Sequence, residues 1–348
     1  MNVLKLLLYP LAAIYNGVTR LRNHLYDIGQ KSSFEFETSV VSVGNLNVGG
    51  SGKTPMVEYL VEQFGNRFPI VTLSRGYKRD TTGFRVAAGD DTALSIGDEP
   101  YQLFRKFGQK IHVAVGEDRV YAIPNILMEF PETKLLILDD AFQHRAIIPN
   151  ISILLTSFDL PFFRDYLVPF GRLREARSGA RRADVVVVTK CPDSLTEGEQ
   201  NLIRKRIQTY AGAKPILFAN ITYGEPVPVR SNRPVASRII LVSGIAQAGP
   251  LLGYCKKKFE VIHHFCFADH HRYTQQDLEA IEKRFRDGGG SQSILTTEKD
   301  MARLDCPEFT EFLDRLPWYS LPVRQAFLKD GSKFDALVLQ AIERASKQ

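Results

Sequence analysis

Short apolar runs and amphipathic stretches alternate along the chain. Six runs of strand length, rich in β-branched residues, occupy the first part of the chain, at residues 38–43, 69–73, 111–115, 134–138, 151–155 and 183–189. Helical patterns separate most of these runs, which predicts a mainly parallel sheet with helices on both faces. Four further runs predict the strands of a second α/β unit, at residues 238–242, 259–263, 292–296 and 317–321. Helical patterns between these strands cover residues 249–257 and 274–286, and the second of them ends at three glycines.

The length and a proline-rich stretch indicate two domains. The chain has 348 residues, whereas a single domain usually has about 100–200. Prolines gather between the two series of strands, as in a connection between domains. We therefore expect an N-terminal helix at 1–34, a first α/β domain at 35–221, a connection at 222–237 and a smaller C-terminal α/β domain at 238–348.

Composition and charge narrow the class of protein. Hydrophobic residues make up 44% of the chain and charged residues 24%, which excludes a mainly disordered chain. The formal net charge of +6 favours an anionic partner without identifying it. A mean hydropathy of -0.15 excludes a polytopic membrane protein. The four cysteines form no CxxC pair, so we expect reduced thiols rather than a zinc site or a disulfide framework: Cys191, Cys255, Cys266 and Cys306.

The first 34 residues depart from this soluble average. An uninterrupted apolar run extends from Leu6 to Tyr15 and contains Pro10, but a helix that spans a bilayer needs about 20 apolar residues. Helical spacing extends the apolar positions into a stripe of Leu4, Leu7, Leu8, Leu11, Tyr15, Val18, Leu21 and Leu25. Basic residues accompany this stripe, which predicts a helix lying in the interface of an anionic membrane. Two alternatives remain open: a helix packed on the protein core, and a signal peptide, although no small-x-small cleavage site follows.

A glycine-rich segment, GNLNVGGSGKT, joins the first strand to a helical stretch. This order is the phosphate-binding P-loop arrangement, in which backbone N–H groups and the helix N-terminus bind phosphate oxygens. The predicted nucleotide-binding residues are Asn47, Val48, Gly49, Gly50, Ser51, Gly52, Lys53 and Thr54. We expect Lys53 to reach the β- and γ-phosphates and Thr54 to offer its hydroxyl to Mg²⁺. Asn47 stands where the motif usually has its first glycine, and asparagine tolerates the left-handed backbone of such a turn.

A P-loop enzyme also needs an acidic group that orients Mg²⁺ after a second buried strand. The segment KLLILDD supplies Asp139 and Asp140, so the candidate metal residues are Thr54, Asp139 and Asp140. The alternative is an ordinary loop at a strand end, where aspartate is common.

The P-loop fold alone leaves GTPase, ATPase, kinase and dethiobiotin-type ligase open. The segment ADVVVVTKCPD is similar to the guanine-reading N/T-K-x-D pattern, but its acid, Asp193, comes one residue late. We therefore expect a central strand whose Lys190 lies near the nucleotide. A GTP-dependent switch or metal-insertion chaperone at the membrane surface stays open as an alternative, as does a non-catalytic membrane-peripheral binding module.

Six further motifs follow one another in a fixed order: SRGYKR at 74–79, IGDEP at 96–100, DDAFQHR at 139–145, VPFGRLREA at 168–176, FADHHRYT at 267–274 and LTTEKDMARL at 295–304. Behind an apolar N-terminal helix and GNLNVGGSGKTP, they closely resemble the tetraacyldisaccharide 4′-kinase family over essentially the whole chain. The chain departs from the usual family pattern at Ala141, where glycine is usual, and near Arg172, where a proline is usual.

The resemblance implies an ATP- and Mg²⁺-dependent kinase. It would phosphorylate the 4′-hydroxyl of a tetraacylated glucosamine disaccharide 1-phosphate, a precursor of lipid A, at the cytoplasmic face of the bacterial inner membrane. We accordingly expect a peripheral or monotopic monomer on the anionic inner-membrane surface, with no nucleic-acid partner. The resemblance further implies substrate contacts by Asn45, Arg75, Gln143, His144, Arg172 and Glu175.

Phosphoryl transfer to a sugar hydroxyl needs a group that receives the hydroxyl proton. Asp98 is the candidate base, at a helix start after Gly97, and its alternative role is to cap that helix. The resemblance implies that Asp98 works with His270, which can orient the carboxylate and raise its proton affinity, or share the proton. A metal site at residues 269–271 is the alternative, although adjacent side chains do not easily share one small ion. Because Asp98 and His270 fall in different domains, we expect an active site between the domains, assembled by their closure.

Six arginines gather between residues 161 and 182 against two acids. We expect them, with exposed Phe162 and Phe163, to form an anion-binding edge for the substrate 1-phosphate and for lipid head groups. A charged loop in solvent is the alternative. Since Arg174 can also neutralise the transferring phosphoryl group, the candidate catalytic residues are Asp98, His270, Lys53 and Arg174.

Overall fold

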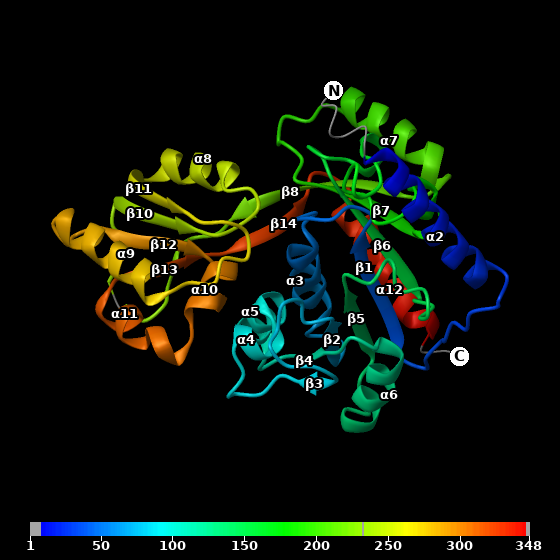
Figure 1. The fold of residues 1–348 in the computed structure, drawn as a ribbon, viewed down its shortest axis with the longest axis horizontal. Helices are drawn as coiled ribbons and strands as arrows, with labels where there is room; N and C mark the ends of the chain where they lie inside the picture. Colours follow the sequence, from blue (N-terminus) through cyan, green and yellow to red (C-terminus); the bar gives the residue numbers. More distant parts are fainter. Residues whose placement is uncertain (1–7, 232, 346–348) are drawn as a thin grey trace.

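The computed structural model describes residues 8–231 and 233–345, which form two α/β bodies and an outer N-terminal helix (Figure 1). A nine-stranded sheet makes the larger body, in the order β14-β8-β7-β6-β1-β5-β2-β4-β3. Its strands are β1 (Ser39–Asn45), β2 (Ile70–Ser74), β3 (Arg85–Val86), β4 (His112–Val115), β5 (Leu135–Asp139), β6 (Ile151–Ser157), β7 (Val185–Thr189), β8 (Ile216–Tyr223) and β14 (Val323–Phe327). All neighbours run parallel except at the two edges, where β14 pairs antiparallel with β8 and β3 with β4.

Helices cover both faces of this sheet, as the alternating pattern predicts. They are α3 (Lys53–Phe64), α4 (Ala93–Ile96), α5 (Asp98–Phe107), α6 (Arg119–Glu129), α7 (Glu197–Ala211) and α12 (Gly331–Ala345), with 3₁₀ turns η1 (Phe162–Arg164) and η2 (Arg177–Arg182). Alternate residues of β1 point to opposite faces. Val41 and Val43 pack with α3, α5 and α12, whereas Val40 packs with α6. Because the central strands are buried on both faces, their sequences are continuous apolar runs.

A five-stranded sheet makes the smaller body, in the order β11-β10-β12-β13-β9. Its strands are β9 (Val227–Pro228), β10 (Arg238–Ser243), β11 (Glu260–Cys266), β12 (Ser293–Thr297) and β13 (Trp318–Leu321). Its helices are α8 (Gly249–Lys258), α9 (Gln275–Asp287), α10 (Glu298–Leu304) and α11 (Thr310–Arg315), with the 3₁₀ turn η3 (Pro307–Phe309). The strands pair in parallel except β9, which is antiparallel to β13. All ten predicted strands are present, with ends shifted by a few residues.

The chain returns to the first sheet after the second body, which corrects the expected C-terminal domain. β14 pairs with β8, and α12 buries Phe334, Val338 and Ile342 in the core that β1 also lines. The range 238–348 is therefore not one unit, because the second sheet ends at β13 and the residues that follow complete the first body. Within the expected connection at 222–237, β9 also belongs to the second sheet.

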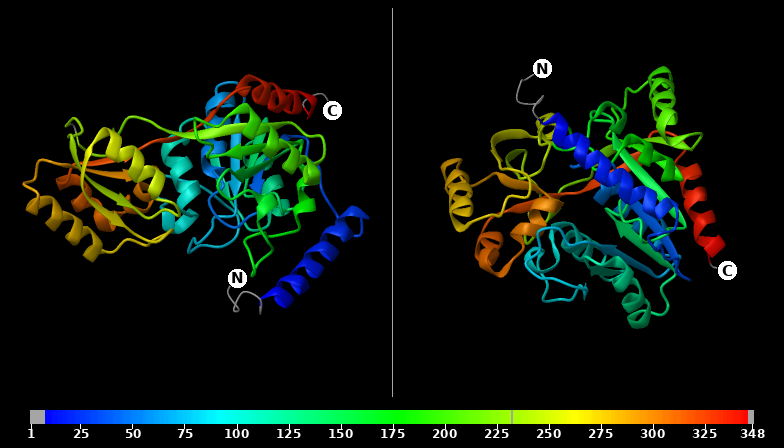
Figure 2. Two further views of the ribbon diagram at one scale, coloured as in Figure 1. Left: turned by 90° about the horizontal axis from the view of Figure 1, so that it is seen from above. Right: turned by 45° about the vertical axis from the view of Figure 1, so that its right-hand side comes forward.

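The N-terminal helix α2 (Tyr9–Asp27) lies along the outside of the larger body (Figure 2). Only Ala12 of this helix is buried, so the core-packing alternative is wrong. Its apolar residues that are more than half exposed are Tyr9, Leu11, Ile14, Val18 and Leu21. Leu11, Val18 and Leu21 of this face belong to the predicted stripe, and Tyr9 and Ile14 join them. The other described positions of that stripe, Leu8, Tyr15 and Leu25, are only partly exposed. The predicted positions Leu4 and Leu7 lie outside the described residues.

Polar contacts hold α2 on the larger body. The Tyr15 hydroxyl donates to the Arg174 carbonyl at 2.8 Å, and Asn23 Nδ2 donates to Glu175 Oε2 at 2.9 Å. The helix therefore turns its polar side to the protein and its apolar side to solvent, the reverse of an ordinary surface helix. Across residues 8–231 and 233–345, no helix has both the length and the apolar character that crossing a membrane requires.

Candidate active site

The P-loop connects the carboxyl end of β1 to the N-terminus of α3. Gly49 and Gly52 have φ angles of 114° and 83°, which glycine adopts without strain. Asn47 differs from the expectation, because its φ is not positive and its side-chain amide instead donates to Asp165 Oδ2 at 2.7 Å. The asparagine therefore anchors the turn through its side chain rather than through left-handed backbone.

The P-loop and the arginine-rich segment form one surface. The Val48 N–H donates to the Arg172 carbonyl at 2.7 Å, and the Arg174 N–H donates to the Leu46 carbonyl at 2.8 Å. This pairing places the GRLRE motif directly beside the phosphate cradle. The sequence predicts both motifs, but their pairing comes only from the fold.

Two cations hold Asp140 at the edge of the P-loop. Arg174 Nη1 lies 2.9 and 3.0 Å from the two carboxylate oxygens, and Lys53 Nζ lies 3.7 Å from Oδ1. Burial acts to raise the pKa of Asp140, but Lys53 and Arg174 outweigh it and hold that pKa below its usual range. Lys53 also donates to Asn45 Oδ1 at 3.4 Å. Lys53, Arg174 and Asp140 therefore form one cluster of predicted site residues, and Asn45 joins it through Lys53.

Asp139 lies one residue earlier, at the end of β5, and its surroundings differ. Burial raises the pKa of Asp139 to about 7, and the charge of Glu99 acts in the same direction. Its Oδ1 is buried without a hydrogen-bond partner. A buried carboxylate oxygen that lacks a donor suits a hard cation such as Mg²⁺. Among the residues that the structure describes, no three or more His, Cys, Asp and Glu side chains are grouped to hold a metal by themselves.

Asp98 is the first residue of α5, and its carboxylate does not cap the helix. Gly97 occupies the N-cap position, and Asp98 Oδ2 accepts a hydrogen bond from His270 Nδ1 at 2.9 Å. The capping alternative is therefore wrong. Arg303 Nε lies 3.3 Å from the same oxygen. Burial acts to raise the pKa of Asp98, but the His270 bond and the Arg303 charge outweigh it and lower that pKa. One of the two effects expected of His270 was a raised proton affinity of Asp98. This expectation is wrong, because the pKa of Asp98 is lowered.

The two adjacent histidines of the DHH motif face different partners. His270 has a φ of 57°, packs edge-on against Tyr77 with ring centres 5.6 Å apart, and has Lys299 Nζ 3.3 Å from its Nε2. His271 Nε2 lies 2.9 Å from Asp277 Oδ2. The two rings therefore do not converge, which removes the alternative of a metal held by residues 269–271. A proton on His270 Nδ1 satisfies Asp98, because Nε2 can then accept from the Lys299 ammonium.

Glu175 and Gln143 form a wall behind Arg174. Glu175 is buried, and Arg182 donates to its two oxygens at 2.8 and 2.9 Å. Gln143 Nε2 donates to Glu175 Oε1 at 3.1 Å and to the Asn45 carbonyl at 2.8 Å. The structure thus brings these predicted substrate residues together, with their polar atoms engaged by one another.

The remaining predicted substrate residues differ in exposure. Burial lowers the pKa of His144 to about 4, the charges of Arg119 and Arg75 act in the same direction, and His144 Nε2 is buried without a partner. The side chains of Arg75 and Arg172 are exposed. These two guanidinium groups are the predicted substrate residues that remain available to an anion from solvent.

Phe162 and Phe163 correct the expected shape of the arginine-rich edge. Their exposed fractions are 0% and 8%, so they belong to the core rather than to a lipid-facing surface. The alternative of a charged loop in solvent fails too, because Arg177 Nη2 donates to the Asp165 carbonyl at 2.8 Å. Burial of the two rings fixes the segment on which Arg172 and its neighbours stand.

Charged groups tie the P-loop helix to the second body. Lys106 Nζ of α5 lies 2.7 Å from Glu58 Oε2 of α3 and 3.0 Å from Glu298 Oε1 of α10. Lys299 of α10 lies 3.2 Å from Glu99 Oε1 of α5. Figure 1 shows α5 and α10 between the two sheets. The helix that carries the candidate base is therefore clamped between the helix that follows the P-loop and the second body.

A family model described as Tetraacyldisaccharide-1-P 4′-kinase matches residues 4–343. The chain belongs to this family. A tetraacyldisaccharide 4′-kinase of Flavobacterium johnsoniae is 38% identical over 348 residues, which cover 99% of this chain and 98% of the relative. One of Parabacteroides distasonis is 40% identical over 357 residues, which cover 98% and 95%. The crystal structure of LpxK from Aquifex aeolicus in complex with ATP has a TM-score of 0.74 and 25% identity, and the match covers 98% of this chain and 100% of that chain.

Two charged residues of the LTTEKDMARL motif reach Asp98 or its histidine, and the sequence assigned them no role. Lys299 and Arg303 stand four residues apart on α10, so both side chains lie on one face of the helix. Thr297 caps this helix by accepting from the Asp300 N–H at 3.0 Å, which fixes where the two cations point. The i, i+4 spacing after a capping threonine is the signal that could have identified them.

The guanine-reading pattern is absent from the end of β7. Asp193, the acid that would complete it, accepts a hydrogen bond from Asn220 Nδ2 of β8. Family membership favours the kinase and not the GTPase or metal-insertion chaperone alternative.

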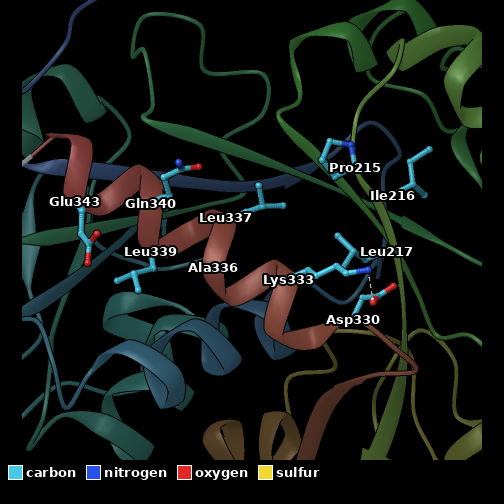
Figure 3. A pocket seen from close by; sticks show the side chains of 10 residues that line it. All are labelled: Pro215, Ile216, Leu217, Asp330, Lys333, Ala336, Leu337, Leu339, Gln340 and Glu343. Carbon is cyan, nitrogen blue, oxygen red and sulfur yellow. Dashed lines mark ion pairs between the residues drawn. The ribbon is translucent and has the colours of Figure 1, made fainter.

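A groove of about 650 Å³ lies elsewhere on the larger body, between α12 and the start of β8 (Figure 3). Its charged lining includes Asp330 and Lys333, which pair with each other at 2.7 Å. None of the predicted site residues lines it. The candidate active site is therefore defined by the charged clusters above rather than by this groove.

Proposed function

We propose that this kinase transfers the γ-phosphoryl group of ATP to the 4′-hydroxyl of a tetraacylated glucosamine disaccharide 1-phosphate, and that Asp98 receives the hydroxyl proton. The observation that carries the assignment is the pair of Asp98 and His270, in which each body supplies one member. Glu99, the next residue, acts on the pKa of Asp139 at the edge of the P-loop. The candidate base and the candidate metal-binding acid therefore belong to one electrostatic site.

The proton step uses the free oxygen of Asp98. In the transfer, the sugar oxygen bonds to the γ-phosphorus while the bond from that phosphorus to the ADP oxygen breaks. His270 and Arg303 hold Oδ2, which leaves Oδ1 to take the proton. A carboxylate whose pKa is lowered takes this proton late, after the sugar oxygen has lost electron density to phosphorus.

The P-loop and two cations bind the triphosphate. Within residues 47–54, the backbone N–H groups other than those of Val48 and Ser51, which already donate to carbonyl oxygens, surround the phosphates, and Lys53 neutralises their charge. Asp140 holds Lys53 and Arg174 in one cluster. Arg174 is thereby positioned to stabilise charge on the transferring phosphoryl group.

We assign the Mg²⁺ ligands to Thr54 and Asp139. The unpaired Oδ1 and the raised pKa of Asp139 fit a cation partner, whereas Asp140 already has Arg174 and Lys53. When bound, Mg²⁺ supplies charge neutralisation at the β- and γ-phosphates. Asp140 then acts by holding the two side-chain cations.

The lipid substrate binds beside this surface. Arg75 and Arg172, whose guanidinium groups are exposed, are the groups that would pair with the substrate 1-phosphate. Asn45, Gln143 and Glu175 shape the wall behind them, and His144 stays neutral because its pKa is lowered. The cationic edge thus recognises the anionic head group while the wall sets its position.

The exposed apolar face of α2 inserts into the interface of an anionic membrane, at the cytoplasmic face of the inner membrane. Its polar side already contacts Arg174 and Glu175, so insertion brings the head-group site to the lipid surface. The protein is peripheral or monotopic, and it acts as a monomer because one chain supplies both Asp98 and His270.

A transfer assay tests the function directly. The full chain is incubated with γ-labelled ATP, Mg²⁺ and tetraacyldisaccharide 1-phosphate in mixed micelles, and labelled lipid is counted. We expect transfer from ATP and a loss of at least about 10²-fold in Lys53→Ala, because phosphate charge is no longer neutralised. Lys205→Ala, at an exposed lysine of α7, is the matched control. Transfer from GTP alone, or no label on the lipid, would contradict the proposal.

A vesicle assay tests the membrane contact. Changing Leu11, Val18 and Leu21 together to serine should weaken binding to anionic vesicles by about 10²-fold, because three apolar side chains no longer enter the interface. ATP binding should be unchanged. Leu202→Ser is the control, since Leu202 is a comparably exposed leucine on α7. If the triple variant sediments with vesicles as wild type does, α2 is not the anchor.

A further inference from the structure

The ammonium group of Lys190 lies beside the P-loop, just after the carboxyl end of β7. Its Nζ is 3.7 Å from the position that a Cβ on Gly50 would occupy. The preceding residue supports the same loop, because Thr189 Oγ1 donates to the Ser51 carbonyl at 2.7 Å. Lys190 is therefore a second lysine at the phosphate cradle, in addition to Lys53.

The backbone of Lys190 is strained. Its φ of 57° lies in the left-handed region, which glycine adopts freely and a residue with a long side chain does not. Strain of this kind persists where the surrounding structure fixes it, and it gathers at binding sites. Glycine would adopt this backbone conformation more easily than lysine does. The side chain of Lys190 is therefore the feature that needs an explanation.

The charge of Lys190 has no ionic partner in the described part of the chain. Its Nζ donates to a neutral acceptor, Gln247 Oε1, at 2.9 Å. Burial lowers the pKa of Lys190, and the charges of Asp159 and Asp269 oppose this shift without forming an ion pair. Lys53, by contrast, lies 3.7 Å from a carboxylate of Asp140. A partly desolvated cation with a neutral partner at a phosphate cradle suits an anionic ligand.

The partner of Lys190 comes from the second body. Gln247 stands in the loop between β10 and α8, whereas the charged contacts between the bodies described above come from α5. Lys190 therefore meets the second body on the β7 side of the P-loop, opposite the α5 clamp in the strand order. A ligand bound by Lys190 would therefore be linked to the second body through the hydrogen bond between Lys190 and Gln247.

We propose that Lys190 is a second phosphate-binding lysine, which binds the terminal phosphates of the nucleotide and through Gln247 links them to the β10–α8 loop. The inference rests on the proposed function, because it takes ATP as the nucleotide. It adds a cation that the P-loop motif does not contain. Lys53 approaches the phosphates from the start of α3, and Lys190 approaches them from β7.

Equilibrium binding of ATP, ADP and AMP, each with Mg²⁺, tests the proposal. We expect Lys190→Met to weaken ATP binding by about tenfold, ADP binding by less and AMP binding not at all, because only the terminal phosphates lose a partner. Lys190→Arg should retain most of the affinity. Lys205→Met on α7 is the matched control. An equal loss for all three nucleotides, or no loss for ATP, would overturn the proposal.

A second variant separates phosphate binding from a purely structural contact. Gln247→Leu removes the neutral acceptor but keeps the lysine, so we expect ATP affinity within about threefold of wild type. A loss in Gln247→Leu equal to that in Lys190→Met would show that the bridge between the bodies, and not the phosphate contact, matters. If wild type itself binds no ATP, the proposed function fails; if wild type binds and Lys190→Met binds equally, only this inference fails.

A measurement on the wild-type chain covers the case in which Lys190→Met does not fold. Acetic anhydride labels free amines, and mass spectrometry reports the labelled fraction of each lysine. We expect ATP to protect Lys190 several-fold more than AMP does, while Lys205 labels equally in both. Equal labelling of Lys190 with ATP and AMP would overturn the proposal.

Discussion

Asp98 and Asp139 are both shielded from solvent at one site, yet their pKa values shift in opposite directions. Burial acts to raise both. Around Asp98, His270 and Arg303 outweigh burial and lower the pKa. Around Asp139, burial prevails, the pKa rises to about 7, and one oxygen has no partner. The difference comes from the partners of the two carboxylates: Asp98 has a histidine and an arginine, whereas one oxygen of Asp139 has no hydrogen-bond partner.

The difference fits the two tasks proposed for these acids. A carboxylate with a histidine and an arginine on one oxygen is charged, oriented and open on its other oxygen, which suits a proton acceptor. A buried carboxylate oxygen that has no hydrogen-bond donor can be satisfied by a bound cation, which suits a metal ligand.

Asp98→Asn should lower kcat by about 10³-fold and leave KM for ATP nearly unchanged, because it removes the proton acceptor but no phosphate contact. Steady-state assays with the lipid acceptor measure both constants. Asp90→Asn, at an exposed aspartate of the same body, is the control. Near-normal turnover in a folded Asp98→Asn protein would end its role as base.

His270→Ala extends this test to the pair. In the wild-type background we expect a large fall in kcat, and in the Asp98→Asn background a much smaller one, because the two groups act as a unit. The four rate constants of this cycle give the coupling. Strictly multiplicative effects would contradict the pair.

Asp139→Asn should lower kcat by about 10²-fold and raise the Mg²⁺ concentration needed for half-maximal rate by about tenfold, because the variant removes a charged ligand. Asp98→Asn should leave this Mg²⁺ requirement unchanged. Titrating Mg²⁺ at saturating ATP measures both variants. If Asp98→Asn shifts the requirement and Asp139→Asn does not, the two tasks are reversed.

Arg303→Gln should move the acid limb of the kcat profile to higher pH, with a loss of about tenfold on that limb and little change at pH 8. In the proposed mechanism the carboxylate of Asp98 receives the proton, so kcat falls as pH drops through its pKa. Removing the cation lets that pKa rise toward its ordinary value, and the fall then begins at higher pH. Arg303→Lys keeps a charge and should restore most of the profile. A uniform loss at all pH values would indicate a structural role instead.

At pH 8 without Mg²⁺, replacing the two acids should change the Tm of thermal unfolding in opposite directions. The lowered pKa of Asp98 means that its charge stabilises the fold above the ordinary pKa, and this contribution is lost as pH falls through the folded value. The raised pKa of Asp139 means that its charge destabilises the fold above about pH 7. Asp98→Asn should therefore lower the Tm and Asp139→Asn should raise it, each by a few degrees, as calorimetry can measure. Shifts of equal sign would contradict the comparison.

The sequence predicts the parts of this site that depend on local chemistry. Strand, glycine turn, GKT and helix form a local pattern, and Asp139 and Asp140 end a buried strand as expected. The exposed stripe of α2 is also visible in periodicity, because a helix face repeats every three or four residues.

What the sequence did not predict depends on long-range pairing. β14 and α12 carry no signal that distinguishes the first sheet from the second, since either sheet could accept an apolar strand. Phe162 and Phe163 stand in a basic segment, yet the fold buries them. Arg303 reaches Asp98 across 205 residues of chain, a distance that no local pattern spans. Partners of this kind decide the pKa values, so the sign of each shift also needed the structure.

The return of the chain to its first sheet has a consequence for the order in which the protein is made. The P-loop and α3 leave the ribosome before the second body, but Phe334, Val338 and Ile342, which complete the core beneath β1, are synthesised after it. The nucleotide-binding body therefore cannot finish folding until the second body has emerged. If α2 anchors the chain as proposed, its apolar face can contact a membrane throughout that interval, before the nucleotide-binding body is complete.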